Sequence, residues 1–237
     1  EGTLSLRING KPDASTADDM ENQVLLGHIP LLLNPQAHDA LVIGLGSGIT
    51  LGSILNYPLN SVDVVEIDPV VPQAATFFNA FSDSPLEDSR VNLHIADGRH
   101  YLLATNKQYD VISSEPSNPL LSGSSKLFTK EFFTLMKNRT KYDGVVIQWI
   151  NMYAIDIIGL SSIIKAYLDV FPHVVAFGVP LSNDILLVGS QKELVFDLAS
   201  LRKNYEIPSV KQDLARIGVT DATEILARFY LDRPALE

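Results

Sequence analysis

The stretch ALVIGLGSGITLGSIL, residues 40–55, decides the fold. It begins as an uninterrupted apolar run of strand length, and after the glycines at 44, 46 and 48 it continues as a helix. Glycines at such a junction let backbone N–H groups at the helix N-terminus approach a ligand closely. The spacing is Gly-x-Gly-x-Gly, with Ile49 where a dinucleotide loop has its last glycine. This pattern favours a nucleoside with an amino-acid-like tail over a pyrophosphate.

The alternation of apolar strands with helices continues along the chain. We expect strands at 62–68, 91–97, 109–114 and 144–150, and an antiparallel pair from 173–179 and 184–190. Strands this apolar form a mostly parallel sheet with helices on both faces. The sequence therefore predicts an α/β domain over residues 20–190, which begins with a helix at 20–32.

Two segments flank this domain. Residues 4–8 alternate in polarity and run into Asn9-Gly10, a strong hairpin turn signal, so residues 1–19 are expected to be a short β segment. The chain from Gln191 to its end is charged and has helical periodicity. We expect a C-terminal helical extension over residues 191–237.

Composition narrows the classes of function. The chain has 237 residues, no cysteine and a net charge of −10. No thiolate site is available, and no histidine or acid has metal-ligand spacing, so no metal is expected. An acidic chain is a poor partner for nucleic acid and suits a cationic substrate, although acidity is also common for solubility alone. No apolar run approaches the roughly 18 residues of a membrane span. His28, on an apolar helix, is interpreted as a hydrogen-bonded core residue.

Acidic residues follow three consecutive strands of the predicted sheet. Glu66 lies 22 positions after Gly44, where a carboxylate can accept both ribose hydroxyls. Asp97 and the N–H of Gly98 could bind an adenine edge, although Asp97 could equally cap the following helix. Ligands of such sheets bind at the carboxyl ends of the strands. The predicted nucleoside site consists of Gly44, Gly46, Ser47, Gly48, Glu66, Asp97 and Gly98.

Glu115 ends the strand 109–114 at the same edge of the sheet. It lies in the segment ISSEPSNPLLSG, residues 112–123, where Pro116 and Pro119 stiffen the loop. A carboxylate there could accept a proton from an attacking amine or hold an ammonium group before attack. The structural alternatives are a loop acid paired with a basic neighbour and an acid in a structural turn. We predict Glu115 as the catalytic group.

The order of these motifs resembles a known family. LVIGLGSG, VVEIDP, IADGRHYL, YDVISSEPSNP, LFTKEFF and GVVIQ follow one another as in the spermidine and spermine synthases, the polyamine aminopropyltransferases. The resemblance covers about residues 4–190 and is closest to the branch that carries SEPSNP, some members of which are fused to a membrane-spanning part. It implies a Rossmann-like sheet of the S-adenosylmethionine methyltransferase type, preceded by a β domain whose upstream strands are missing here.

The resemblance also implies partners and roles. Decarboxylated S-adenosylmethionine would be the aminopropyl donor, a small cationic amine would be the acceptor, and homo-oligomers are common in the family. Glu66 would bind the ribose, Asp97 and Gly98 the adenine, and Glu115 would stand at the family's catalytic aspartate. Gln148 matches a family glutamine near the site. The location would be cytoplasmic, as a separate protein or as the cytosolic domain of a membrane-anchored one.

Three positions depart from the family pattern. Ser47 replaces an aspartate that binds the donor amine, Asn22-Gln23 replaces a Tyr-His pair, and Asn118 replaces a second loop aspartate that grips the polyamine. Gln23, Asn118 and Gln148 are the predicted substrate-binding residues. We expect aminopropyl transfer to a polyamine nitrogen. Ser47 does not repel a carboxylate, so an amine methyltransferase that uses S-adenosylmethionine is the first alternative. The lost charges motivate the second alternative, a non-catalytic nucleoside-binding sensor domain.

Overall fold

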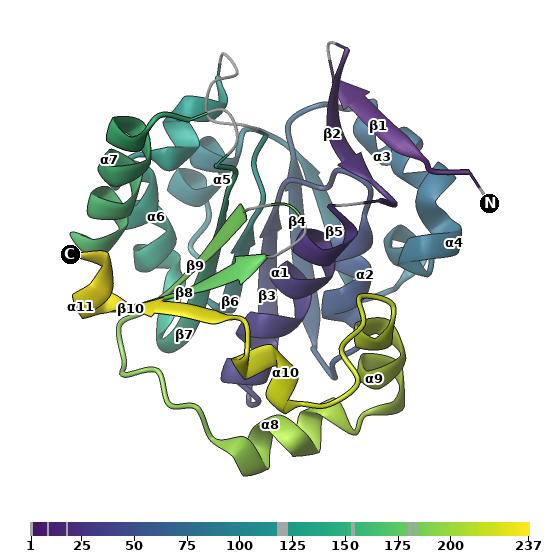
Figure 1. Cartoon of the computed structure of the whole chain (residues 1–237). Helices are drawn as coiled ribbons and strands as arrows, with labels where there is room; N and C mark the ends of the chain where they lie inside the picture. Colours follow the sequence, from purple (N-terminus) through teal and green to yellow (C-terminus); the bar gives the residue numbers. More distant parts are fainter. Residues whose placement is uncertain are drawn as a thin grey trace.

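The predicted strands assemble into one mixed sheet in the computed structural model (Figure 1). The structure describes residues 2–8, 10–17, 19–117, 123–152, 155–179, 182 and 184–237. Within this part of the chain the strand order is β10-β8-β9-β7-β6-β3-β4-β5. The parallel strands are β3 (Asp39–Ile43), β4 (Ser61–Glu66), β5 (Val91–Ile95), β6 (Tyr109–Ser114) and β7 (Thr140–Ile150).

The strand order reverses at β3, which pairs with β4 on one side and with β6 on the other. Such a switch point leaves a crevice at the carboxyl ends of the strands, where ligands of open α/β sheets bind. Beyond β7, the strands β9 (Asp184–Ser190) and β8 (His173–Val179) form the predicted antiparallel pair. The fold class predicted from the sequence is confirmed.

Helices bury both faces of the sheet. One face is covered by α1 (Met20–Leu33), α2 (Ile49–Leu55), α8 (Leu198–Tyr205), α9 (Pro208–Ala215) and α10 (Thr223–Leu226). The other face is covered by α5 (Gly98–Ala104), α6 (Lys130–Arg139), α7 (Ile157–Leu168) and the terminal α11 (Arg233–Leu236). Shorter elements carry the remaining connections: α3 (Val71–Ala75), η1 (Thr76–Phe78), α4 (Asn79–Ser82), η2 (Pro85–Glu87) and η3 (Ser124–Phe128). None of the described helices is long and apolar enough to cross a membrane.

The predicted N-terminal hairpin is confirmed as β1 (Ser5–Ile8) and β2 (Lys11–Ser15), an antiparallel pair separate from the main sheet. In Figure 1 it stands at the upper edge of the sheet, near the loops that follow the parallel strands. Ala14 lies close to the glycine-rich loop, because a Cβ placed on Gly46 would be 3.6 Å from the Cβ of Ala14. The hairpin therefore helps to enclose the predicted ligand site.

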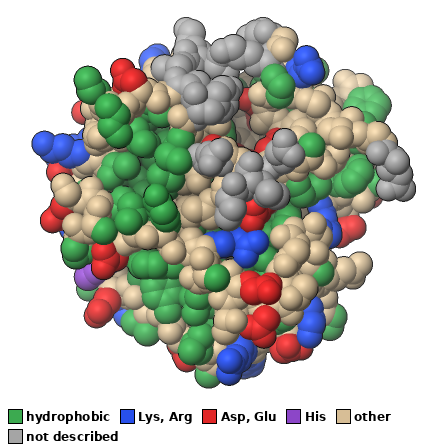
Figure 2. Space-filling model, viewed as in Figure 1, with side chains coloured by type: hydrophobic (Ala, Val, Ile, Leu, Met, Phe, Trp, Pro, Cys, Tyr) green, Lys and Arg blue, Asp and Glu red, His purple; other side chains and the backbone are tan. Residues whose placement is uncertain are grey.

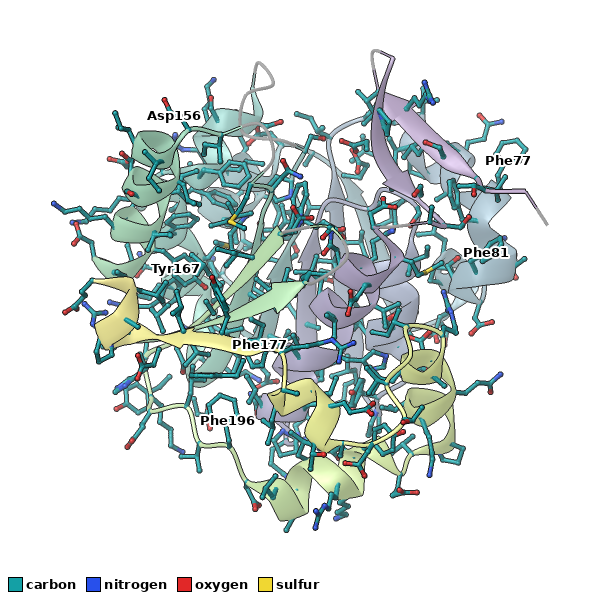
Figure 3. All side chains as sticks on the ribbon, in the orientation of Figure 1. Phe77, Phe81, Asp156, Tyr167, Phe177 and Phe196 are labelled. Carbon is teal, nitrogen blue, oxygen red and sulfur yellow. The ribbon has the colours of Figure 1, made fainter. Side chains whose placement is uncertain are left out.

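The C-terminal segment is wrongly predicted in one respect, because it is not helical throughout. Phe229–Asp232 form strand β10, which pairs with β8 at the edge of the sheet. Phe229 lies opposite Phe177 in the register, and both rings contact Phe196 (Figure 3 labels Phe177 and Phe196). The prediction failed because the periodicity of the tail is a local pattern. It does not show that the edge of β8 is open for pairing and that an aromatic cluster packs against the added strand.

Two buried interactions tie the C-terminal segment to α1. The ring of His28 is fully buried, with Nδ1 2.9 Å from the hydroxyl of Tyr57 and Nε2 2.9 Å from Oδ2 of Asp213 on α9. Arg228 forms an ion pair with Glu21, with an N–O distance of 2.8 Å. His28 is therefore the satisfied core residue that the sequence predicted.

Hydrophobic side chains also gather on the surface. In Figure 2 they cluster on the side of α7, where Ile157 and Ile158 are 73% and 74% exposed. Phe229 and Tyr230 of β10 add further exposed apolar area. These residues do not line the cavity described below.

Candidate active site

A cavity of about 650 Å³ opens at the carboxyl ends of the parallel strands. Its wall is built from the loops after β3, β4, β5 and β6, from the hairpin and from η3. The volume lies in the range of pockets that hold a small molecule. Most of the residues predicted from the sequence line it: Gln23, Gly44, Gly46, Ser47, Glu66, Asp97, Gly98 and Glu115.

Gly44 lets β3 and β6 come together under the cavity. Its φ is +95°, in the left-handed region, and a Cβ on this residue would lie 2.5 Å from the backbone oxygen of Glu115. Only glycine allows this approach, because the obstructing atom is backbone and cannot rotate away. Gly46 and Gly48 also have positive φ, and the turn leads directly into α2. The glycine-rich loop thus fixes the position of residue 115.

Glu66 is held by two backbone amides. Its Oε2 accepts a hydrogen bond from Leu45 N at 3.0 Å, and its Oε1 accepts one from Asp68 N at 2.9 Å. The residue is 7% exposed and faces the cavity. A carboxylate has about four lone-pair sites, so both oxygens can accept a further hydrogen bond. The geometry suits a residue that accepts ribose hydroxyls.

Asp97 is the helix cap that the sequence allowed, and it also lines the cavity. Its Oδ1 accepts a hydrogen bond from His100 N at 2.9 Å and caps α5. It also lines the cavity beside Gly98, where a Cβ would lie 2.8 Å from Cγ2 of Ile43. The helix cap fixes the carboxylate at the cavity wall, next to Gly98, which lines the same cavity.

Glu115 lies at the carboxyl end of β6 and contacts Thr50 on α2. The distance from Thr50 Oγ1 to Glu115 Oε2 is 2.6 Å. The pKa of Glu115 is raised to about 8, mainly by burial and also by the negative charges of Asp19, Asp13 and Asp184, while the hydrogen bond from Thr50 lowers it. The basic partner of the first structural alternative is not found among the described residues. A carboxyl group with this pKa can gain or lose a proton near neutral pH.

Asp13 and Asp184 were missed by the sequence reasoning. Asp13 on β2 lines the cavity, and burial raises its pKa against a hydrogen bond from Ser117. Asp184 on β9 is 3% exposed and accepts hydrogen bonds from Asn22, from Trp149 Nε1 at 3.0 Å and from Asn151 at 3.1 Å. The acidic composition hinted at such groups. No local pattern indicated that the hairpin would bring Asp13 to the cavity, or that β9 would place Asp184 near enough to act on Glu115.

Ser47 and Gln23 bind each other rather than lying free. The hydroxyl of Ser47 donates to Oε1 of Gln23 and accepts a hydrogen bond from Ile49 N at 3.2 Å. Both amide hydrogens of Gln23 are used, to Ser15 O at 2.9 Å and to Asp19 O at 3.1 Å. Gln23 thus joins the hairpin to the glycine-rich loop, and for a substrate it retains only acceptor capacity.

Gln148 is not brought to the cavity wall. It is fully buried on β7 and donates a hydrogen bond to Trp149 O at 2.9 Å. Its Oε1 has no hydrogen-bond partner among the described residues, and neither has the hydroxyl of Ser114, its neighbour on β6. Asn118, the third predicted substrate residue, lies outside the described residues. In the described part of the chain no group of three or more His, Asp or Glu side chains could hold a metal ion.

The fold is that of an α/β domain of the S-adenosylmethionine methyltransferase type, with a cavity at the carboxyl ends of its parallel strands. The chain belongs to the spermine/spermidine synthase domain family, which matches residues 20–182. It is 30% identical over 141 residues to a polyamine aminopropyltransferase of Alkaliphilus oremlandii, covering 59% of this chain and 49% of that protein. It is 34% identical over 133 residues to a polyamine aminopropyltransferase of Methanocaldococcus jannaschii, covering 55% of this chain and 45% of that protein. The chain therefore spans about half the length of these relatives.

Solved structures share the fold. Spermidine synthase from Thermotoga maritima superposes with a TM-score of 0.77 at 24% identity, covering 95% of this chain and 76% of that one. A spermidine synthase in complex with the transition-state analogue AdoDATO gives a TM-score of 0.75 at 24% identity, covering 90% and 77%.

Proposed function

We propose that the protein transfers an aminopropyl group from decarboxylated S-adenosylmethionine to a nitrogen of a small polyamine. The nitrogen lone pair forms a bond to the aminopropyl carbon next to sulfur, the C–S electron pair moves to the sulfonium, and methylthioadenosine leaves. The nitrogen then carries one proton too many, which Glu115 accepts. The observation that carries the proposal is the carboxyl group of Glu115, which lines the same cavity as Glu66 and Asp97 and whose pKa burial raises to about 8.

The remaining residues of the cavity bind and orient the donor. Glu66 accepts the ribose hydroxyls, and Asp97 with the N–H of Gly98 binds the adenine edge. The sulfonium is itself an activated leaving group, so the protein contributes mainly alignment and the removal of one proton.

The acids around Glu115 favour the decarboxylated donor. The glycine-rich loop offers the neutral Ser47, but Asp13 lines the cavity and Asp19 lies near enough to raise the pKa of Glu115. Two carboxylates attract the ammonium group of the decarboxylated donor and of the acceptor, and they repel the carboxylate of intact S-adenosylmethionine. We propose Asp13 as the residue that replaces the missing aspartate of the loop.

An amine methyltransferase that uses intact S-adenosylmethionine is the second candidate. Lys126 of η3 lines the same cavity and provides a cation for a carboxylate, and Ser47 does not repel one.

A cytoplasmic location, a membrane-anchored form of the whole protein and homo-oligomerisation stay predictions from the family resemblance.

Product analysis tests the proposal. The protein is incubated with each donor and a panel of diamines and polyamines, and the nucleoside product is identified by mass spectrometry. We expect methylthioadenosine from the decarboxylated donor, and Glu115→Gln should bind this donor with unchanged affinity without transferring the group. S-adenosylhomocysteine as the sole product would favour the methyltransferase. Tight donor binding without turnover would indicate a sensor, and normal turnover by Glu115→Gln would exclude Glu115 as the proton acceptor.

A further inference from the structure

Thr50 lies between the helix α1 backbone and the carboxyl group of Glu115. Its Oγ1 is 3.0 Å from the carbonyl oxygen of Gln23 and 2.6 Å from Oε2 of Glu115. Thr50 is 2% exposed, so no bulk water competes for its hydroxyl. Nothing in the sequence singled out this residue, because the contact depends on how α2 packs against α1 near the carboxyl end of β6.

The hydroxyl of Thr50 has one hydrogen and two neighbouring oxygens. The carbonyl of Gln23 can only accept a hydrogen bond, whereas a carboxyl group donates when protonated and accepts when ionised. If Glu115 is protonated, it can donate to Thr50 while Thr50 donates to Gln23. If Glu115 is ionised, the Thr50 hydrogen turns to the carboxylate, and 2.6 Å is a typical distance for this charge-assisted bond.

We propose that Thr50 is a positioning residue for Glu115, which accepts a hydrogen bond from the protonated carboxyl group and donates one to the carboxylate. The carboxyl group can then change its protonation state without moving. This inference rests on the proposed function, in which Glu115 accepts the proton of the attacking amine.

Among the described residues, Thr50 is the group that stabilises the ionised form of Glu115. The other groups that act on Glu115 are Asp13 on β2, Asp19 before α1 and Asp184 on β9, and all three are acids that disfavour its ionised form. No other described residue donates a hydrogen bond to its carboxyl group, and Oε1 accepts none from the described part of the chain. Thr50 therefore stabilises the ionised form through Oε2, while Oε1 stays available for the substrate.

Close helix packing holds Thr50 in place. Gly27 of α1 faces α2, and a Cβ on Gly27 would lie 2.5 Å from Cβ of Ser53 and 3.0 Å from the backbone oxygen of Thr50. The two helices can approach this closely only because residue 27 has no side chain. The distance from Thr50 to Gln23 is thus set by backbone packing and not by a mobile side chain.

Titration of Glu115 in three variants tests the inference. Thr50→Val removes the hydroxyl with little change of shape, whereas Thr50→Ser keeps a hydroxyl at this position. Ser53→Ala is the control, because it removes another buried hydroxyl of α2, one that donates a hydrogen bond to Asp213 and not to Glu115. The side-chain carboxyl of Glu115 is followed by carbon-13 NMR in protein labelled at glutamate, and its signal is assigned by its loss in Glu115→Gln. Thermal unfolding establishes that each variant is folded at the temperature of titration.

We expect Thr50→Val to raise the pKa of Glu115 by about one to two units, since a hydrogen bond to a charged group is lost. Thr50→Ser and Ser53→Ala should titrate like the wild type. The acid limb of the pH profile of kcat/KM should move by the same amount in Thr50→Val, so that the loss is about 10- to 100-fold at pH 7 and small at high pH.

The result that would overturn the inference is an unchanged pKa of Glu115 in Thr50→Val, or an equal shift in Thr50→Ser. A wild type that forms no methylthioadenosine, but whose Glu115 titration shifts in Thr50→Val and not in Thr50→Ser, would refute the proposed function and support the contact. Turnover by the wild type with no shift in Thr50→Val would refute the inference and leave the proposed function intact.

Discussion

Substitution of Gly44 by alanine tests whether backbone contact places Glu115. The new Cβ would lie 2.5 Å from the backbone oxygen of Glu115, and ordinary contact begins at 3.4 Å, so the two strands must separate by 3.4 − 2.5 = 0.9 Å. A misplacement of about 1 Å at a reacting group lowers a rate by about 100-fold. We therefore expect a fall of about that size in the single-turnover rate of nucleoside release at saturating donor.

Gly218→Ala is the matched control. Gly218 has φ +75°, compared with +95° for Gly44, but a Cβ on it would meet nothing within 4 Å. Both alanines are strained by about 1–2 kcal/mol in the left-handed region, and each kcal/mol lowers the Tm of a chain of this size by about 2–4 °C. Gly218→Ala should lose this stability but keep the wild-type single-turnover rate. Gly44→Ala should lose more stability, and its single-turnover rate should fall.

Differential scanning calorimetry and rapid-quench kinetics on the two variants give both quantities. A Gly44→Ala protein that turns over at the wild-type rate would show that the approach of the two backbones does not place the proton acceptor. Equal loss of rate in Gly218→Ala would show that backbone strain, and not displacement of Glu115, is the cause.

Three further outcomes are expected. Glu66→Gln should weaken donor binding about 10- to 100-fold in calorimetric titration, because one hydrogen bond to a charged group is lost and an amide NH₂ faces a backbone donor. Burial raises the pKa of Glu115 from 4.5 to about 8, so between these pH values the folded protein holds a proton that the unfolded chain releases. The stability of the wild type, measured relative to Glu115→Gln, should therefore fall as the pH rises from 4.5 to 8. An equal stability difference at both pH values would argue against a buried acid. Burial acts to raise the pKa of Asp213, but hydrogen bonding and ion pairing with His28 outweigh it and lower the pKa. In chemical denaturation, Asp213→Asn should therefore be less stable than the wild type near pH 7 and approach it below pH 3.8. A stability difference that does not change with pH would contradict this.

The strand–loop–helix units could be predicted because each is encoded locally. The run at residues 40–45 is apolar on both faces, and the acids at 66, 97 and 115 each follow such a run, so one edge of the sheet was predicted to collect them. The cavity does bring these three acids together. Their order along the chain was sufficient because parallel strands end at the same edge.

The missed features depend on packing between distant segments. Asp13 reaches the cavity only because the hairpin folds against Gly46, and the role of Thr50 depends on the contact between α1 and α2. Strand β10 forms because the edge of β8 is open to it. Gln148 was expected at the site from the family resemblance, but it is fully buried and does not line the cavity.

The attachment of the C-terminal segment to α1 has a practical consequence for dividing the protein. The matched family region ends at residue 182, yet Leu201, Val210 and Leu214 belong to the same buried cluster as α1. A fragment cut after Ser190 would expose that apolar surface and leave the carboxylate of Glu21 without its guanidinium. Expression trials and limited proteolysis should therefore treat the tail and the helix bearing Gln23 as one cooperative unit. We expect trimming of the tail to disturb the cavity that Gln23 lines.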